Sequence, residues 1–369
     1  MERRRAGDDV IVLSLGDPDF DAPDPVVDAA VASLRGGRTH YTPARGEPAL
    51  LAAICAWTAR QTGVDVGADR VVFLPGAQAA LYAVIACLAG HGDEIVVPEP
   101  AYTTYAGVVA ASGARMVGVP LRAERGFHLL AGDVAAAFTS RTRAVLINTP
   151  HNPTGAAMTP HELAELVRLC GEHDVWLVSD EVYGSLTFSG DHASALAAPG
   201  AQERVAVVSS LSKSHAMTGF RHGWAIAPEP LADAIGVLVQ SMLFGSPPFV
   251  QDAGLAALSQ TEAATTAMRE AYERRARLVV DGLAGAPGVH ARMPEGGMFV
   301  LADIRGTGLD GATFADRLLD EEAVSVLPID AFGPSGWGHV RISLTAPDAQ
   351  LTEAARRVCG LAARLVPAA

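Results

Sequence analysis

The sequence is short of positive charge, of cysteine and of long apolar runs. Its formal net charge is −13 over 369 residues, which repels the phosphates of nucleic acids and anionic lipids, so we expect neither as a partner. The longest apolar run, residues 79–89, is too short to cross a bilayer. The basic start at Arg3, Arg4 and Arg5 precedes too short an apolar stretch for a signal peptide.

Cysteine is too sparse for a disulfide framework or a metal site. The four cysteines form no Cys-x-x-Cys pair, and each lies in an apolar, helix-like context: Cys55, Cys87, Cys170 and Cys359. We expect buried free thiols in a reducing cytoplasm. The 49% of hydrophobic residues can build a large core, and in a chain of this length we expect that core to divide into two lobes.

Lysine is the scarcest residue of all, because Lys213 is the only one and every other basic residue is arginine. A guanidinium stays protonated and is a very poor nucleophile, whereas a primary amine can lose its proton and form an imine with a carbonyl. One interpretation is that arginine is favoured throughout and a single surface lysine has survived. The other is that a carbonyl cofactor requires Lys213.

The hydrophobic pattern predicts an α/β fold. Strand-like runs alternate with helix-like segments, which is typical of a mostly parallel sheet covered by helices on both faces. The predicted strands of this sheet are 71–74, 94–97, 144–147, 175–178, 205–209 and 224–227, and the predicted helices are 76–88, 102–111, 160–170, 230–243, 249–258 and 262–283. A smaller α+β lobe follows, with strands over 298–304, 324–328 and 339–344 and helices over 312–320 and 347–365.

Two short matches point to other classes of enzyme. Residues 306–311 fit the Gly-x-Gly-x-x-Gly fingerprint of dinucleotide-binding folds, but only one strand follows them, so a polar turn is the better interpretation. The stretch from Ser210 to Lys213 fits the Ser-x-x-Lys signature of acyl-serine enzymes, but the chain has no Lys-Thr-Gly motif.

Lys213 follows the end of a predicted strand, where ligands of such sheets bind. Ser210, Ser212 and Arg221 flank it and suit an anion such as a cofactor phosphate. The strand over 175–178 runs into Asp180 and Tyr183. These residues suit a protonated pyridine nitrogen and a phenolic oxygen, although a helix cap explains the carboxylate as well.

Two further turns are weaker candidates. Asn152 stands in the turn-rich stretch Asn148-Thr149-Pro150-His151-Asn152-Pro153-Thr154-Gly155, where a plain turn is the simpler interpretation. The stretch Gly76-Ala77-Gln78 opens a predicted helix, and the free N–H groups of a helix start can bind an anion.

Taken in order, these segments resemble the class I aminotransferases of the type I pyridoxal-phosphate fold, along nearly the whole chain. The resemblance rests on Gly16-Asp17-Pro18-Asp19-Phe20, Tyr41-Thr42-Pro43, Asn152-Pro153-Thr154-Gly155, Asp180-Glu181-Val182-Tyr183, Ser212-Lys213 with Arg221, and Val340-Arg341-Ile342-Ser343. Within the family, Gly76 to Tyr82, Ser210 to Met217, Phe244 to Pro247 and Ala331 to Ser335 resemble arginine–pyruvate transaminases and related enzymes of guanidino amino acids.

The resemblance implies pyridoxal 5'-phosphate as cofactor and a role for each matching residue. Lys213 would hold the cofactor as a Schiff base and move the substrate proton, and Asp180 would keep the pyridine nitrogen charged. Tyr183 and Asn152 would bond the phenolic oxygen, and Tyr102 would stack on the ring. The phosphate would lie among Gly76, Ala77, Gln78, Ser210, Ser212, Arg221 and Tyr41 of the partner subunit. The substrate carboxylate would lie among Arg341, Asn152 and Gly16.

The resemblance also implies a homodimer and a division into three segments. Residues 1–40 would join the small domain, 41–270 would form the large cofactor-binding domain, and 271–369 the small domain. The family usually has a further helical segment before the strand near Val10, so an arm over the substrate is expected to be absent or supplied from elsewhere.

The expected reaction moves the amino group of a guanidino amino acid, such as arginine or a cyclised derivative like enduracididine, to a 2-oxo acid such as pyruvate. Aspartate-selective relatives carry a lysine where this chain has Ala77, so an acidic substrate is not expected. A cationic side chain needs a carboxylate, for which Asp19, Asp21 and Glu47 are the candidates. A β-lyase or arginine oxidase on the same fold, and a non-catalytic cofactor-sensing module, are the alternatives.

Overall fold

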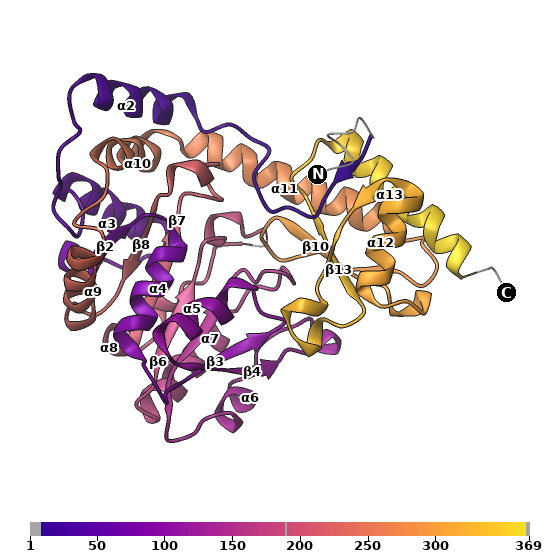
Figure 1. Ribbon diagram of the computed structural model, residues 1–369, viewed down its shortest axis with the longest axis horizontal. Helices are drawn as coiled ribbons and strands as arrows, with labels where there is room; N and C mark the ends of the chain where they lie inside the picture. The colour runs from indigo at the N-terminus through magenta and orange to yellow at the C-terminus, as the bar shows by residue number, and fades with distance from the viewer. Residues whose placement is uncertain (1–8, 189, 367–369) are drawn as a thin grey trace.

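The computed structural model describes residues 9–188 and 190–366, so the basic start at residues 3–5 lies outside the described residues. Two lobes lie side by side, a large one around a seven-stranded sheet and a small one around β10 and β13 (Figure 1). The long helix α11 (Glu262–Leu283) runs from the large lobe into the small one. Within the described part of the chain, no helix has the length and apolar character that a membrane span requires.

The large sheet has the strand order β2-β8-β7-β6-β5-β3-β4. β8 runs antiparallel to both of its neighbours, β2 and β7, whereas the other pairs are parallel, so the carboxyl ends of β5, β6 and β7 meet at one edge. This confirms the predicted α/β fold with a mostly parallel sheet. The strands are β2 (Val71–Leu74), β3 (Glu94–Glu99), β4 (Arg115–Pro120), β5 (Thr142–Asn148), β6 (Trp176–Asp180), β7 (Val205–Ser210) and β8 (Gly223–Ile226).

Helices cover both faces of this sheet because its strands are apolar on both sides. In β2, Val71 and Phe73 enter one core, whereas Val72 and Leu74 enter the other. The first core is covered by α2 (Asp24–Arg35), α3 (Pro48–Thr62), α7 (Pro160–Glu172) and α10 (Pro248–Gln260). The second is covered by α4 (Ala77–Leu88), α5 (Thr104–Ser112) and α9 (Glu229–Met242). Two short helices, α6 (Ala131–Ala136) and α8 (Ala201–Arg204), complete the lobe.

The small lobe has a core of its own, beneath a four-stranded sheet of order β12-β13-β10-β9. Its elements are β9 (His290–Ala291), β10 (Phe299–Asp303), β12 (Leu327–Pro328), β13 (His339–Ser343), α12 (Gly311–Glu322) and α13 (Asp348–Leu365). A parallel pair, β1 (Ile11–Val12) and β11 (Val324–Ser325), lies beside it. The glycines at 306–311 form a turn before α12, whose first turn is capped by the Asp310 carboxylate.

The N-terminal segment contacts both lobes. Ile11 and Leu13 enter the core of the small lobe, whereas Val26 and Ala30 of α2 enter a core of the large lobe. The expected division near residues 40 and 270 stays a prediction, and α11 passes through the second of these boundaries.

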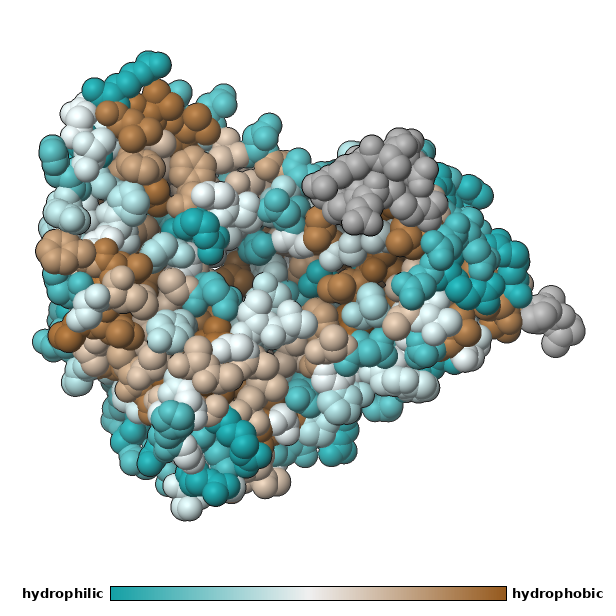
Figure 2. Space-filling view, in the orientation of Figure 1, coloured by the Kyte–Doolittle hydropathy of each residue, from teal (hydrophilic) through white to brown (hydrophobic). Residues whose placement is uncertain are grey.

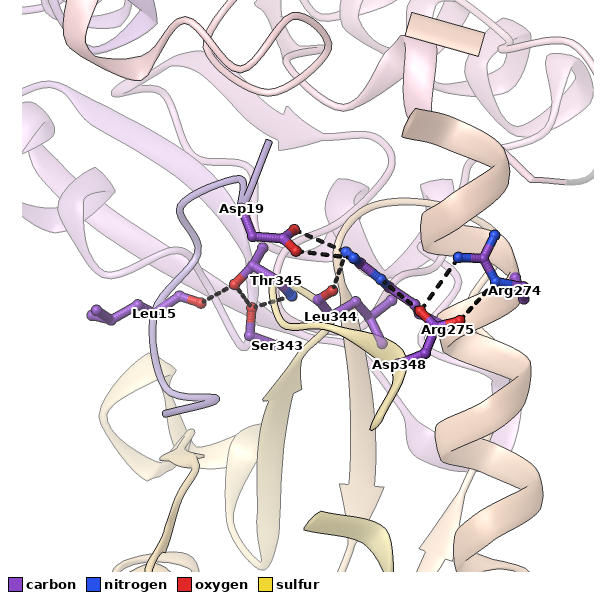
Figure 3. A network of polar contacts seen from close by, with 8 residues as sticks. All are labelled: Leu15, Asp19, Arg274, Arg275, Ser343, Leu344, Thr345 and Asp348. Atoms are coloured by element: carbon purple, nitrogen blue, oxygen red, sulfur yellow. Dashed lines mark hydrogen bonds and ion pairs between the residues drawn. The ribbon is translucent and has the colours of Figure 1, made fainter. Parts of the chain in front are cut away.

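A polar network fixes the N-terminal segment to the small lobe (Figure 3). Arg275 of α11 donates two hydrogen bonds to the Asp19 carboxylate, at 2.8 and 2.9 Å. The same guanidinium donates to the Leu344 carbonyl and to Asp348, which also pairs with Arg274. Because Arg275 is 6% exposed, these partners compensate a charge that is nearly removed from water.

Candidate active site

A cavity of about 340 Å³ opens at the carboxyl ends of β5, β6 and β7, between the two lobes. The structure brings together there most of the residues that the sequence singles out. Those lining the cavity are Gly16, Ala77, Gln78, Tyr102, Asn152, Asp180, Tyr183, Ser210, Ser212, Lys213, Arg221 and Arg341. Lining residues that the sequence reasoning gave no role include Asp17, Tyr105 and Phe299.

Asp180 is the buried acid of this cavity, at the end of β6. Burial raises the pKa of its carboxyl group to about 6, because the charged form loses hydration. Two donors partly offset this effect: the Tyr105 hydroxyl at 2.7 Å and the Val182 N–H at 3.2 Å. The carboxylate is therefore placed where it can pair with a buried cationic group.

Lys213 lies in the turn after β7, and its ammonium group donates to the Gly16 carbonyl at 2.6 Å. Burial lowers the pKa of this amine, and the charges of Arg341 and Arg221 lower it further, whereas Asp17 opposes them. A lowered pKa leaves more of the amine neutral at a given pH, which is the form that attacks a carbonyl.

Arg341 of β13 is held rigidly from several sides. It donates to the Asn152 side-chain carbonyl at 2.8 Å and to the Ser14 backbone carbonyl at 3.1 Å. Its guanidinium lies 3.9 Å from the centroid of the Phe299 ring. The Asn152 amide in turn donates to the Tyr183 hydroxyl at 3.4 Å. Each of the two Nη groups of Arg341 carries a second N–H besides the one bound to Asn152 or Ser14, so the guanidinium retains donors for an anion in the cavity.

The start of α4 and Arg221 form a close-packed corner of the cavity. Gly76 has φ +88°, and a Cβ there would lie 2.5 Å from Arg221 Nη2, so the backbone can approach the guanidinium only without a side chain. Arg221 has φ +56° and donates to the Thr218 carbonyl at 2.9 Å. The N–H groups of the first turn of α4 and the Arg221 guanidinium therefore meet at one place, which suits a phosphate.

Tyr41 is the predicted cofactor residue that lies farthest from this arrangement. It is 85% exposed, packs against Phe244 with ring centroids 4.7 Å apart, and does not line the cavity. Within one chain the structure thus leaves Tyr41 on the outer surface.

The three carboxylates considered for a cationic substrate side chain lie elsewhere. Asp19 is paired with Arg275, and Glu47 lies 3.2 Å from Arg38. Neither of them, nor Asp21, lines the cavity.

The model of the family "aminotransferase class I and II" matches residues 8–358. The chain belongs to this family. The aminotransferase is 50% identical to an arginine–pyruvate transaminase of Pseudomonas aeruginosa over 366 residues, which is 99% of the chain and 93% of that protein. It is 36% identical to an aspartate aminotransferase of Musicola paradisiaca, over 90% of the chain and 84% of that protein.

Solved structures agree with this assignment. An aspartate aminotransferase from Thermus thermophilus with maleate matches with a TM-score of 0.93 at 35% identity, covering 99% of this aminotransferase and 94% of that chain. The family depends on pyridoxal 5'-phosphate. The expected fold, enzyme class and cofactor are thereby confirmed.

The cavity suits this cofactor on its own chemistry. A lysine amine with a lowered pKa matches the aldehyde, and a buried carboxylate matches the pyridine nitrogen. The corner formed by Gly76 and Arg221 matches the phosphate, since a Cβ would close it.

Proposed function

We propose that this aminotransferase moves the amino group of an amino acid with a guanidino side chain, arginine or a cyclised derivative such as enduracididine, to a 2-oxo acid such as pyruvate. The observation that carries the proposal is the 50% identity to an arginine–pyruvate transaminase along 99% of the chain. Ala77 supports it, because its methyl side chain offers no cationic group to an acidic substrate side chain, and Arg221 beside it is assigned to the cofactor phosphate.

We assign the cofactor contacts as follows. Lys213 binds the aldehyde carbon, Asp180 the pyridine nitrogen, and Tyr183 and Asn152 the phenolic oxygen, while Tyr102 stacks on the ring. The phosphate contacts are Gly76, Ala77, Gln78, Ser210, Ser212, Arg221 and the partner's Tyr41. Bound pyridoxal phosphate supplies an electron-withdrawing ring that makes the substrate Cα–H acidic.

The chain's own groups then position the substrate and move its proton. Arg341 binds the substrate carboxylate, and because Asn152 and Ser14 already fix the guanidinium, little freedom is lost on binding. Gly16 packs against the Phe299 ring that carries this guanidinium, since a Cβ there would lie 2.8 Å from Phe299 Cζ. The Lys213 amine would be freed when the substrate amine takes its place on the aldehyde carbon, and in its neutral form it would be the base that takes the proton from Cα and holds it for return.

We propose a homodimer whose partner chain completes the site. Apolar side chains gather on the outer face of α2 (Figure 2), where Val27, Val31 and Leu34 are each more than a third exposed. Tyr41 and Phe244 are also exposed. A second copy that covers this surface would remove it from water.

Subunit exchange tests the dimer and the role of Tyr41 together. Mixed dimers of Lys213→Ala and Tyr41→Ala chains contain one site with Lys213 and a Tyr41 from the other chain. Activity well above both parents would support a contact across the interface. Activity no higher than the parents', in dimers shown to be mixed, would contradict it. We keep the cytoplasm as the proposed location, on the negative charge and the four free cysteines. The expectation that these thiols are buried holds for Cys170 alone, because Cys55, Cys87 and Cys359 are partly exposed.

The visible absorbance of the enzyme with pyridoxal phosphate tests the reaction. Loss of the absorbance on adding L-arginine without an acceptor, and its return on adding pyruvate, is the expected result. Absorbance that arginine leaves unchanged would overturn arginine as the substrate, and absorbance that a cyclised derivative also leaves unchanged would overturn the guanidino class. Oxygen uptake, or ammonia release without a 2-oxo acid, would instead indicate the oxidase or the β-lyase.

A further inference from the structure

We infer that Asp17 is the carboxylate that binds the cationic side chain of the substrate. The inference rests on the proposed function, because it concerns how a guanidino group is recognised in the cavity already described. Asp17 was not among the carboxylates that the sequence suggested for this role.

Asp17 belongs to a backbone segment that contacts both Arg341 and Lys213. The Ser14 carbonyl accepts a hydrogen bond from Arg341, and the Gly16 carbonyl accepts one from the Lys213 amine. Asp17 is the next residue, and consecutive Cα atoms are about 3.8 Å apart. Asp17 also lines the cavity, where its charge acts on Lys213.

The acidic groups in this cavity are few. Among its described lining residues only Asp17 and Asp180 are carboxylates. Asp180 is buried and bound by Tyr105, whereas Asp17 is exposed to the cavity. The charge of Asp17 acts on Lys213, but no hydrogen-bond donor within the described residues is bound to its carboxylate. Asp17 is thus the acid that is available to a substrate.

The neighbouring acid has a different task. Asp19, two residues along, points away to Arg275 and anchors the segment (Figure 3). Because Asp19 fixes the backbone on the small-lobe side, Asp17 is held in place without a contact of its own. Asp19 is thus neutralised by the protein, whereas Asp17 is left for a ligand.

The charge balance of the cavity supports the same conclusion. Each cation that lines it has another partner in the proposed function: the cofactor phosphate for Arg221, the substrate carboxylate for Arg341 and the cofactor aldehyde for Lys213. None of these groups needs Asp17, so its negative charge remains for a cationic side chain. A carboxylate can accept two parallel hydrogen bonds from a guanidinium, which a neutral amide cannot reproduce.

The test compares Asp17→Asn with wild type on L-arginine and on L-citrulline, the neutral analogue of the same length, with pyruvate as acceptor. We expect kcat/KM for arginine to fall by about tenfold or more, as for a charge pair at a partly desolvated site, with little change for citrulline. Asp21→Asn is the matched control, because Asp21 is an exposed acid of the same segment outside the cavity.

Binding without turnover gives a second measurement. Calorimetry with δ-guanidinovalerate, which lacks the reacting amine, should show the same loss of affinity in Asp17→Asn. Binding of δ-ureidovalerate should be unaffected. An equal fall for both ligands and both substrates would show that Asp17 acts on Lys213 or the cofactor, and would overturn the inference.

The two proposals can fail separately. A wild-type enzyme that uses arginine, combined with an Asp17→Asn variant that keeps its preference over citrulline, overturns only the role of Asp17. A wild-type enzyme that transaminates other amino acids but no cationic one overturns the proposed substrate and the inference together.

Discussion

Replacing Tyr105 by phenylalanine removes one hydrogen bond from the buried Asp180 carboxylate and nothing else in the cavity. In the native chain the pKa of Asp180 is about 6, although the Tyr105 hydroxyl lowers it from 2.7 Å away. A hydrogen bond to a charged group contributes about 1.5–3 kcal/mol. Since one pKa unit is about 1.4 kcal/mol, the variant's Asp180 should titrate about one to two units higher.

The consequence is a change in how pyridoxal phosphate binding depends on pH. A carboxylate with a pKa near 6 is mostly ionised at neutral pH, whereas one with a pKa near 8 is about a tenth ionised. Cofactor affinity of Tyr105→Phe should therefore be lower by up to about tenfold at pH 7 and close to wild type at about pH 9. The sign follows from the proton that Asp180 must lose before it can pair with the pyridinium.

Fluorescence or absorbance titration of the apoenzyme between about pH 6 and 9 measures this shift. The control is Tyr82→Phe, because Tyr82 of α4 is partly buried and its hydroxyl makes no hydrogen bond within the described residues. If Tyr105→Phe and wild type showed parallel pH profiles, the Tyr105 hydroxyl would not control the ionisation of Asp180.

Three other changes have defined outcomes. Lys213→Ala should lose the visible absorbance of bound cofactor and reduce turnover by on the order of a thousandfold or more, and full turnover would refute its role. Asp19→Asn should lower the free energy of unfolding in urea by about 2 kcal/mol, because Arg275 is nearly buried; an unchanged midpoint would contradict this. Burial also lowers the pKa of three histidines, to about 4 for His151 and His215 and to about 3 for His222. Unfolded histidines take up protons below about pH 6.5, so these three should together bind about three protons on unfolding near pH 5, whereas Asp180, with a pKa of about 6 in the folded chain, should release about one. The balance is a net uptake of protons, so stability should fall on acidification; a flat profile would contradict burial of the histidines in the neutral form.

The strands of the large sheet were predictable because they are short apolar runs buried on both faces. The run 205–209, for example, is observed as β7, Val205–Ser210. The edge strand β4 was missed, since its outer residues are exposed and its pattern is irregular. The predicted strand 324–328 is wrong as a single unit, because β11 pairs with β1 and β12 with β13.

The helices α2 and α3 were also not predicted, although local signals for them exist. Pro48 stands in the first turn of α3, and Gly63 ends it in a left-handed conformation. Arg60 is the only charged residue of α3, so this helix has no polar face, and apolar residues of α2 such as Val27 and Leu34 face outward. Their docking is decided by partners more than 200 residues later in the chain, such as Asp252, which binds Ser33 and Arg38.

In the candidate site, the residues that occur in dense motifs could be found from the sequence. Residues that act through tertiary contact could not. Tyr105 reaches Asp180 across 75 positions, and Phe299 lies under Arg341 from a neighbouring strand. Nothing in the local pattern around either aromatic residue distinguishes it from an ordinary core residue.

The ion pair between Asp19 and Arg275 determines which parts of the enzyme would move together. Ser14, Gly16 and Asp17 are tied to the small lobe, as is Arg341, whereas Lys213 and Asp180 stand on the large sheet. A rotation of one lobe against the other would therefore move Arg341 and the segment that contains Asp17 together, as one rigid unit. The 2.6 Å hydrogen bond from Lys213 to the Gly16 carbonyl joins the large lobe to this unit, so it is the contact that such a rotation would break first.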